Sequence, residues 1–455
     1  MDRGRGCARG GLRGCRLGLV LGHLLSRIGG KVTEKTPQSV WKVTGFKETM
    51  IAVVSAFGAW SVLLPVVPLA VLDSGGSATL AGATTGVFML ATVLTQMATP
   101  MLLRIFGYRP IMAASALLLG LPALGHMLGD AAPISLGFSA LRGIGFGALT
   151  VAENALIAEI TPRRLLGKAT GIFGLFIGAA QMAFLPLGLA VASAFNYNTV
   201  YILAVGLGLL EFFTCILVPQ IKAAPVGFPD PTDTTPRAPM WKLVLVPALA
   251  LTSFSVSYGV ASNFISPAVR ELDPERGAVL GGLMLSVIGG SAMIARYVAG
   301  VVADRVGQPG TLMIPAQAFS VFGVGLIAAV LWQEWSVWLL VFGTVIYGAG
   351  FGIVQNEALL SMFDRLPRER LSEGSAVWNI FYDGGTGLGS TVLGAVVAMS
   401  GYDGAFAAGA AIIAVGLLMS TADRALGKTR VSELNDIQTR LRMIRRPRRP
   451  GKEVR

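Results

Sequence analysis

The amino-acid sequence predicts an all-α polytopic membrane protein with twelve transmembrane helices, arranged in two six-helix pseudo-symmetric bundles with both termini in the cytoplasm. Three observations lead to this prediction. The chain of 455 residues is 53% hydrophobic and only 14% charged, whereas soluble domains carry about 25% charged residues. Apolar runs of membrane-spanning length recur along the chain, and one long polar segment divides them into two sets of six.

Each predicted span is an apolar run that is long enough to cross a membrane, because a spanning helix needs about 20 mostly apolar residues. Most connections between the runs are very short. The predicted spans are 50–72, 79–103, 110–129, 133–158, 168–193, 199–218, 242–268, 278–302, 311–332, 335–360, 372–399 and 403–422.

The remaining segments are polar or basic. Residues 219–241 are rich in Pro and polar side chains, and we expect a cytoplasmic linker between an N-terminal bundle, 50–218, and a C-terminal bundle, 242–425. Residues 1–49 are rich in Gly and Arg. We expect a disordered cytoplasmic tail there, with a targeting peptide as the alternative. Residues 426–455 form a basic tail, also expected in the cytoplasm.

The two sets of spans resemble each other. Span 4 contains GIGFGALTVAENALIAEITPRR and span 10 contains GAGFGIVQNEALLSMFDRLPRE, which share Gly-x-Gly-Phe-Gly, an internal Glu and a terminal Pro. The matching Phe146 and Phe351 lie 205 positions apart, from 146 to 351. Internal repeats of this kind are common in transporters, whose substrate site lies between the repeats.

The net charge of +12 indicates membrane topology and not nucleic-acid binding, because the basic residues gather in the tails and in loops on one side. The outer loops hold only Arg270 and Arg276. The basic C-terminal tail either contacts anionic membrane lipid or serves topology alone. The inner loops contain Arg104, Arg109, Arg163, Arg164, Lys168, Lys222, Arg237, Lys242, Arg305, Arg365, Arg368 and Arg370.

The stretch GVVADRVGQ, residues 300–308, ends span 8 with a charged pair between glycines. Gly300 allows two helices to approach closely, and Gly307 permits a tight reversal into span 9. Asp304 can face the positive N-terminal end of a neighbouring helix, while Arg305 stands where the chain leaves the hydrocarbon. We expect a contact here that holds one conformation and releases in another.

This motif resembles the loop signature of the major facilitator superfamily, Gly-x-x-x-Asp-Arg-x-Gly, and the span-4 sequence LRGIGFGALTVAENALIAEITPRRLLGKATG is similar to another motif of that family. The resemblance covers roughly residues 45–425. It implies a secondary transporter that moves a small molecule by alternating access. It also implies a cytoplasmic gate built from Gly300, Asp304, Arg305 and Gly307.

The N-terminal copy of the gate motif departs from the family pattern. Arg104 and Ile105 occupy positions where the family usually has Asp and Arg, and only Gly107 and Arg109 remain. Span 5 is similar to the glycine-rich span of antiporters, but Leu185 precedes Pro186 where Gly is expected. The resemblance therefore suggests export without requiring it.

Ionisable residues within spans are expensive and are functional candidates by default. Arg142 matches the family's membrane-embedded arginine, which is linked to proton coupling. Glu153 lies eleven positions later on the same helix, from 142 to 153, which is roughly 16 Å and close to three turns. The two side chains either line one aqueous path for protons or substrate, or form structural bridges between helices.

Four further polar residues complete the candidate site. Arg296 on span 8 and Asp383 on span 11 either form a salt bridge or take part in coupling. Asn379 shares the face of Asp383, and Glu357 on span 10 lies in the repeat counterpart of the Glu153 region. For Glu357 a solvated carboxylate is the alternative. Glu211 on span 6 is expected to be structural.

Other chemistry finds little support. The three cysteines, Cys7, Cys15 and Cys215, show no metal-ligand spacing, and no phosphate-binding Gly-x-x-x-x-Gly-Lys motif is present. We expect no metal, no cofactor and no enzymatic activity.

The expected protein is a monomeric plasma-membrane transporter for proton-coupled efflux of a drug-like amphipathic compound or a sugar-like metabolite. Uptake of a small metabolite is one alternative, and a non-transporting sensor or lipid-handling protein is another.

Overall fold

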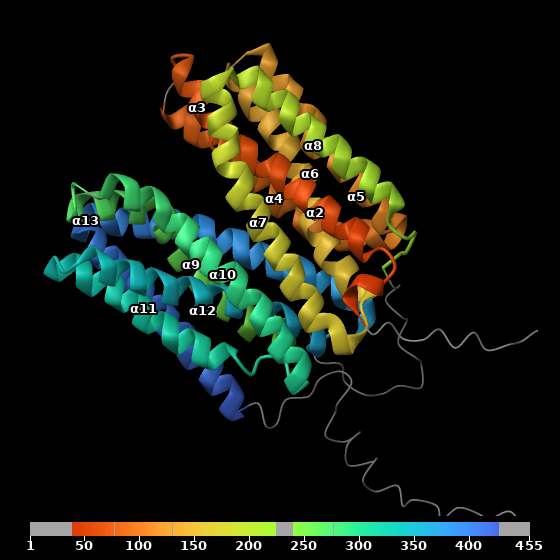
Figure 1. The fold of residues 1–455 in the computed structure, drawn as a ribbon. Coiled ribbons are helices and arrows are strands. Elements are labelled where there is room, and N and C mark those ends of the chain that lie inside the picture. The colour runs from red at the N-terminus through yellow and green to blue at the C-terminus, as the bar shows by residue number, and fades with distance from the viewer. Residues whose placement is uncertain (1–38, 77, 130, 224–239, 276, 427–455) are drawn as a thin grey trace, which may run out of the picture. The chain divides into compact units, whose positions relative to one another are not determined.

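The computed structural model describes residues 39–76, 78–129, 131–223, 240–275 and 277–426, and every regular element among them is a helix (Figure 1). Most of the predicted N-terminal tail, the centre of the predicted linker and nearly all of the predicted C-terminal tail lie outside these residues. The first described residues form a short helical turn, η1 (Val40–Lys42), before α2 begins at Phe46, four residues ahead of the predicted span.

After η1, the described residues of the first half form seven α-helices and two further short 3₁₀ segments. A break at Leu64 and Pro65 divides the first predicted span into two helices, because proline has no backbone N–H to give to the preceding turn. The elements are α2 (Phe46–Leu63), α3 (Val66–Asp73), α4 (Ala78–Phe106), α5 (Tyr108–Gly120), η2 (Leu121–Leu128), α6 (Ala132–Ile160), η3 (Arg163–Leu165), α7 (Leu166–Ala194) and α8 (Tyr197–Leu217).

The described residues of the second half form five α-helices and one short 3₁₀ segment. The last is a continuous stretch of 56 residues with non-helical backbone angles at Ser400 and Gly401, where φ of Gly401 is +75°. Glycine adopts this left-handed conformation without steric cost, so two helices meet at this kink. The elements are α9 (Met240–Leu272), α10 (Gly277–Val306), α11 (Met313–Gln333), α12 (Val337–Arg365), η4 (Arg368–Arg370) and α13 (Leu371–Leu426).

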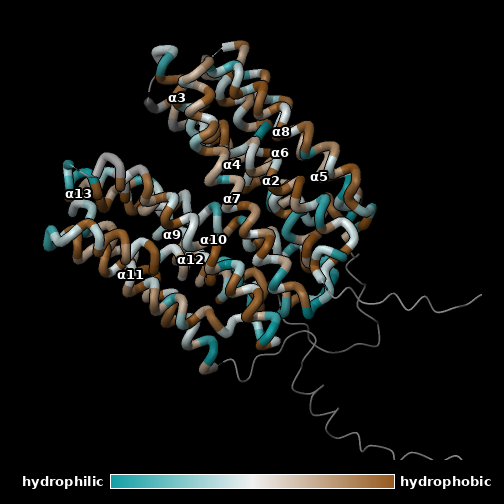
Figure 2. The backbone as a smooth tube through the Cα atoms, in the orientation of Figure 1, coloured by the Kyte–Doolittle hydropathy of each residue, from teal (hydrophilic) through white to brown (hydrophobic). Residues whose placement is uncertain are grey.

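Eleven helical stretches of the described chain are long and apolar enough to cross a membrane. The eleventh, Arg368–Ala425, spans 58 residues and includes the kink in α13. It is long enough for two crossings, because one crossing needs about 20 residues. Large apolar side chains remain exposed along many helices, for example Met97 at 66% and Phe319 at 66%, and hydrophobic residues recur along the helix lengths (Figure 2). Such surfaces suit contact with lipid.

The helices pack mainly within two groups, which we call the first group (α2 to α8) and the second group (α9 to α13). In the first group, α4 packs on α6, and α2 on α7 and α8; in the second, α9 packs on α13, and α12 on α10 and α11. The groups meet where α7 contacts α10 and where α13 contacts α4 and α6. We call the end of the helices where α8 stops and α9 starts the linker end.

Candidate functional site

A cavity of about 470 Å³ lies between the two helix groups, which is within the range of pockets for drug-sized molecules. Helices α2, α6 and α7 line it from the first group, and α9, α10, α12 and α13 from the second. Among the residues that line this central cavity, Arg296 is the cation and Asp383 is the carboxylate. A molecule inside it would touch both groups at once.

Aromatic rings form one wall of the central cavity. Tyr258 stacks on Phe351 with ring centroids 5.0 Å apart, Phe351 stacks on Tyr382 at 6.0 Å, and Tyr382 stacks on Trp378 at 5.3 Å. The rings come from α9, α12 and α13, so this wall belongs to the second group. On the first group, Phe173 is among the aromatic residues that line the cavity. The wall offers flat apolar surface and few polar groups.

Arg296 lies at the end of this aromatic wall, on α10. Its guanidinium carbon is 5.8 Å from the centroid of Phe173 and 5.6 Å from that of Trp378, which is cation–π distance. Its Nη1 donates a hydrogen bond to Oε1 of Gln355 at 3.0 Å. Its Nε and Nη2 are buried without a hydrogen-bond partner in the described structure. The side chain, only 4% exposed, is thus held mainly by aromatic faces.

Asp383 joins the two groups by a hydrogen bond. Nε2 of Gln96 on α4 donates to its Oδ2 at 2.7 Å. The same Gln96 nitrogen lies 3.4 Å from Oγ1 of Thr150, which also lines the central cavity. Because Gln96 belongs to the first group and Asp383 to the second, the state of this carboxylate bears directly on the contact between groups.

The expected salt bridge between Arg296 and Asp383 does not form. Arg296 bonds to Gln355 and Asp383 to Gln96, and no ion pair between the two is present among the described residues. Both side chains nevertheless line the central cavity, and so does Asn379, whose Nδ2 donates to the carbonyl of Ser375 at 2.9 Å. The structure therefore brings three of the six predicted cavity residues together.

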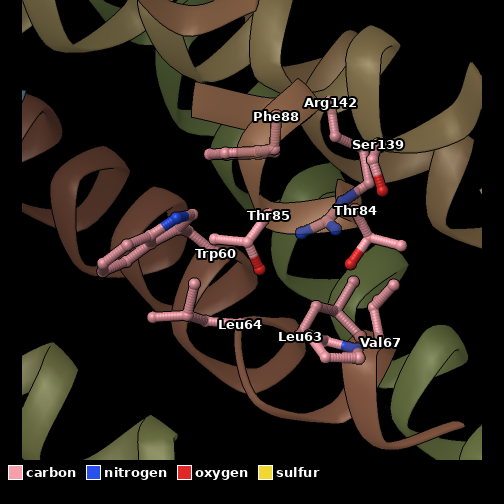
Figure 3. Close-up of a pocket in the computed structure, with 10 residues that line it drawn as sticks. Trp60, Leu63, Leu64, Val67, Thr84, Thr85, Phe88, Ser139 and Arg142 are labelled. Atoms are coloured by element: carbon pink, nitrogen blue, oxygen red, sulfur yellow. The ribbon is translucent and has the colours of Figure 1, made fainter. Parts of the chain in front are cut away.

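Arg142 lies elsewhere. It points into a small pocket of about 20 Å³ inside the first group, which is lined also by Trp60, Thr84 and Ser139 (Figure 3). This is room for about one water molecule. The guanidinium lies 5.6 Å from the ring centroid of Phe88, and Nε is buried without a partner in the described structure. Arg142 does not line the central cavity.

Glu153 is fully buried and lines neither of these two cavities, so Arg142 and Glu153 do not share one path in this conformation. Its neighbour Asn154 does line the central cavity. Glu211 on α8 is also fully buried. The carboxylate oxygens of both glutamates have no hydrogen-bond partner among the described residues.

Glu357 has a local structural contact. Its Oε2 accepts a hydrogen bond from the backbone N–H of Leu312, at 3.4 Å, directly before α11 begins. An acidic group is favourable at this position because it faces unpaired amides and the positive end of the helix. Glu357 does not line the central cavity.

The C-terminal gate motif joins the two groups at the linker end. Oδ1 of Asp304 accepts from the backbone N–H of Gly167 and Oδ2 from that of Lys168, each at 2.7 Å, in the first turn of α7. Gly300 packs so tightly that a Cβ atom there would collide with the carbonyl of Gly167. Gly307 has φ of +68°, the left-handed region that favours glycine. Arg305 is exposed.

The N-terminal copy of the motif makes a contact of opposite polarity. Arg104, which stands at the position equivalent to Asp304, pairs with Glu373 in the first turn of α13 and donates to the carbonyl of Glu369 at 3.2 Å. Gly107 has φ of +90° and faces Ile221, whose carbonyl a Cβ atom would approach to 2.8 Å. Arg109 lies half-buried one residue into α5.

Two more contacts join the groups. The hydroxyl of Ser375 donates to the carbonyl of Val151 at 2.8 Å, and Arg368 donates to the carbonyl of Glu159 at 2.8 Å. Arg368 also lies 3.5 Å from the Glu159 carboxylate.

Sequence reasoning did not single out Phe173 and Asn154, which line the central cavity, or the Arg296–Gln355 bond. Gln355 belongs to the polar cluster Gln355 to Glu357 within an apolar span, and this cluster is the feature of the sequence that could have indicated a buried polar contact. For Phe173, nothing in the sequence distinguishes a phenylalanine that lines a cavity from one that packs against a neighbouring helix.

The family model described as Major Facilitator Superfamily matches residues 49–390. A curated relative from Escherichia coli (strain K12), an uncharacterized transporter named YebQ, is 26% identical over 123 residues. That match covers 27% of this chain and 27% of the length of YebQ.

Solved structures share the fold at low sequence identity. The human organic anion transporter MFSD10 (TETRAN) matches with a TM-score of 0.66 and 15% identity, covering 82% of this chain and 98% of its own. The E. coli fucose:proton symporter FucP matches with a TM-score of 0.66 and 14% identity, covering 84% and 98%. The proton:xylose symporter XylE matches with a TM-score of 0.65 and 13% identity, covering 83% and 95%.

Proposed function

The chain belongs to the Major Facilitator Superfamily, and from this premise we propose that it is a proton-coupled secondary transporter working by alternating access. It is a multi-pass membrane protein of a transporter family. The observation that supports the proposal best is the central cavity, which lies between the two helix groups and contains one carboxylate and one guanidinium. A small-molecule substrate would bind there.

Alternating access requires contacts that break and re-form. The described hydrogen bonds and ion pairs between the groups run from the Gln96–Asp383 bond to the linker end, where Asp304 meets α7 and Arg104 meets α13. We propose that the groups are the two moving bundles and that the linker end is cytoplasmic, in line with its basic residues. Breaking these contacts would open the cavity to the cytoplasm.

Asp383 is our candidate for the proton-binding group. When ionised, it accepts a charge-assisted hydrogen bond from Gln96, and such bonds are stronger than neutral ones. Protonation would weaken a contact that joins the groups. Proton binding and separation of the groups would then be linked, as coupling requires.

For the direction of transport we propose efflux, supported by the glycine-rich sequence of span 5. The aromatic wall favours a drug-like amphipathic compound over a sugar, whose hydroxyls need many polar partners. Uptake stays as the second candidate, because Leu185 replaces the glycine of the antiporter motif. We further propose a monomer in the plasma membrane.

The test measures transport in membrane vesicles with an imposed pH gradient. A pH-sensitive dye reports the size of the gradient while a panel of amphipathic compounds is added. We expect some compounds to collapse the gradient with wild type, and Asp383→Asn to remove this effect while expression persists. Asp403→Asn on the same helix, which does not line the central cavity, is the matched control.

Unchanged flux in Asp383→Asn would remove this residue from coupling. A rate of compound transport that does not depend on the pH gradient would exclude proton coupling. The absence of any flux across the panel would favour a non-transporting sensor or lipid-handling protein. The sign of the dye response separates efflux from uptake.

A further inference from the structure

We infer that the central cavity selects amphipathic molecules that carry a negative charge, and that Arg296 is the residue that binds the anionic group. This inference rests on the proposed transport function and names the chemical class of its substrate. It arises from three features of the cavity: an incompletely satisfied guanidinium, the absence of an ion pair to Arg296 among the described residues, and the adjoining aromatic wall.

The first feature is the hydrogen bonding of Arg296. A guanidinium carries five N–H donors, and the described structure gives this one a single hydrogen bond, to Gln355. Nε and Nη2 are buried and have no partner among the described residues. Buried charges in proteins are usually paired and hydrogen-bonded, because desolvating an unpaired charge is costly. The site therefore has unused capacity for an acceptor.

The second feature is the counter-charge. Asp383 is the carboxylate that lines the same cavity, and it accepts its hydrogen bond from Gln96 on α4 instead of from Arg296. The ion pairs found among the described residues lie elsewhere and do not include Arg296. A ligand that brings its own carboxylate, sulfonate or phosphate would supply the missing negative charge, and a guanidinium binds such groups with two parallel hydrogen bonds.

The third feature fixes where the rest of the ligand lies. Phe173 and Trp378 clamp the guanidinium from two helix groups, with ring centroids 5.8 Å and 5.6 Å from its carbon. From Trp378 the stacked wall continues through Tyr382 and Phe351. An anionic group at Arg296 therefore places the attached apolar body along flat aromatic surface.

Other substrate classes fit less well. A cation would meet the positive charge of Arg296, and the Asp383 carboxylate already has a donor. A neutral apolar molecule would leave the two guanidinium nitrogens unsatisfied. We therefore assign the site to amphipathic organic anions with a planar or aromatic body.

The experiment uses the purified full chain in lipid nanodiscs, without any gradient. Three probes share one skeleton and differ only in charge: 4-phenylbutyrate, 4-phenylbutanamide and 4-phenylbutylamine. A second set uses the carboxylate, amide and aminomethyl derivatives of naphthalene. Binding is measured by calorimetry and by the shift in unfolding temperature. We expect each carboxylate to bind at least about tenfold more tightly than its amide or amine, as charge-assisted hydrogen bonds allow.

The key variant is Arg296→Gln, which should abolish the preference for the carboxylate while leaving amide binding within about twofold. Arg270→Gln, at an exposed arginine near the end of α9, changes the net charge equally and should bind like wild type. If Arg296→Gln fails to fold, Gly174→Ala serves instead. Its new Cβ would collide with the Arg296 side chain, so the carboxylate should bind more weakly although the charge remains.

Several outcomes would overturn the inference: amide or amine binding as tight as the carboxylate, no binding of any probe to wild type, or a preserved carboxylate preference in Arg296→Gln. These outcomes are separate from failure of the proposed function. Carboxylate binding without proton-driven flux would support the anion site and reject coupled transport. Proton-driven flux of cations that is indifferent to Arg296 would do the reverse.

Discussion

At the scale of single residues, the most informative feature is a set of buried ionisable side chains with polar atoms that lack a hydrogen-bond partner in the described structure. Arg142, Glu153, Glu211 and Arg296 are each at most 4% exposed, and each keeps a side-chain nitrogen or oxygen without a hydrogen bond in the described structure. Keeping an unpaired charge buried costs on the order of several kcal/mol. Arg296 differs from the two glutamates because it lines a cavity large enough for a ligand.

Glu211 lies on α8 and is fully buried. Its carboxylate makes no hydrogen bond in the described structure, and it does not line the central cavity. We expect Glu211→Gln to retain full proton-driven flux and an unfolding temperature no lower than that of wild type, because glutamine has nearly the same size and no charge to bury. Vesicle flux and thermal unfolding check this. A loss of flux in a folded variant would instead place Glu211 on the coupling path.

At the scale of helices, the two copies of the gate motif hold the groups together by different chemistry. On one side the Asp304 carboxylate binds two backbone amides at the N-terminus of α7. On the other side Arg104 reaches a carboxylate, Glu373, within the first turn of α13. Both contacts join the end of one helix to the first turn of a helix in the other group. The side chain at position 304 is negative, whereas the side chain at the equivalent position 104 is positive. The N-terminal motif, which departs from the family pattern, therefore makes a different contact, in which Glu373 of α13 pairs with Arg104.

This reversal can be tested by restoring the usual charge. Arg104→Asp should lower flux, because the new carboxylate faces Glu373; the lost ion pair is worth about 1 kcal/mol or less at this exposure. Adding Glu373→Gln should recover flux, because the new carboxylate then faces the positive end of α13 without an opposing carboxylate at position 373. Vesicle flux measures both variants, with Glu373→Gln alone as the control. Equal flux in Arg104→Asp and the double variant would contradict the reversed contact.

Asp304→Asn tests the other copy. Losing the charge weakens two short hydrogen bonds to α7, by about 1–2 kcal/mol in total, and should increase the population with an open linker end. Spin labels at Arg163→Cys and Gln308→Cys, both exposed positions, in a background where the three native cysteines are Ser, should report longer distances. Glu271→Gln, at an exposed site on α9, is the control. An unchanged distance distribution would mean that Asp304 does not hold this end closed.

At the scale of the whole molecule, the sequence predicted the helices well and the contacts between them poorly. Each helix coincides with a long apolar run, because every backbone group in lipid must be satisfied within a helix. The break at Leu64 and Pro65 was not predicted, although proline marks it. A run of apolar residues fixes where a helix lies along the chain, but says little about which face it turns toward a neighbour.

The candidate site shows the same limit. Arg296, Asn379 and Asp383 line one cavity, whereas Arg142, Glu153 and Glu357 do not. The partners were different: Gln355 replaces Asp383 beside Arg296, and Gln96 from the other half of the chain holds Asp383. Pairing across helices depends on rotation and depth, which a single sequence leaves open. For the same reason Arg142 and Glu153, which share one helix, lie in separate surroundings.

The two gate contacts differ in chemistry, so their strengths depend differently on the salt concentration. The Arg104 and Glu373 side chains are 24% and 22% exposed, and dissolved ions screen such pairs over about 8 Å at 0.15 M. The bonds of Asp304 run to backbone amides, whose dipoles are fixed by the helix. A rise in ionic strength at the linker end would therefore weaken the Arg104–Glu373 contact more than the Asp304 contact. The two halves of the seam would then separate unequally, and the conformation at rest would depend on the salt concentration around this end.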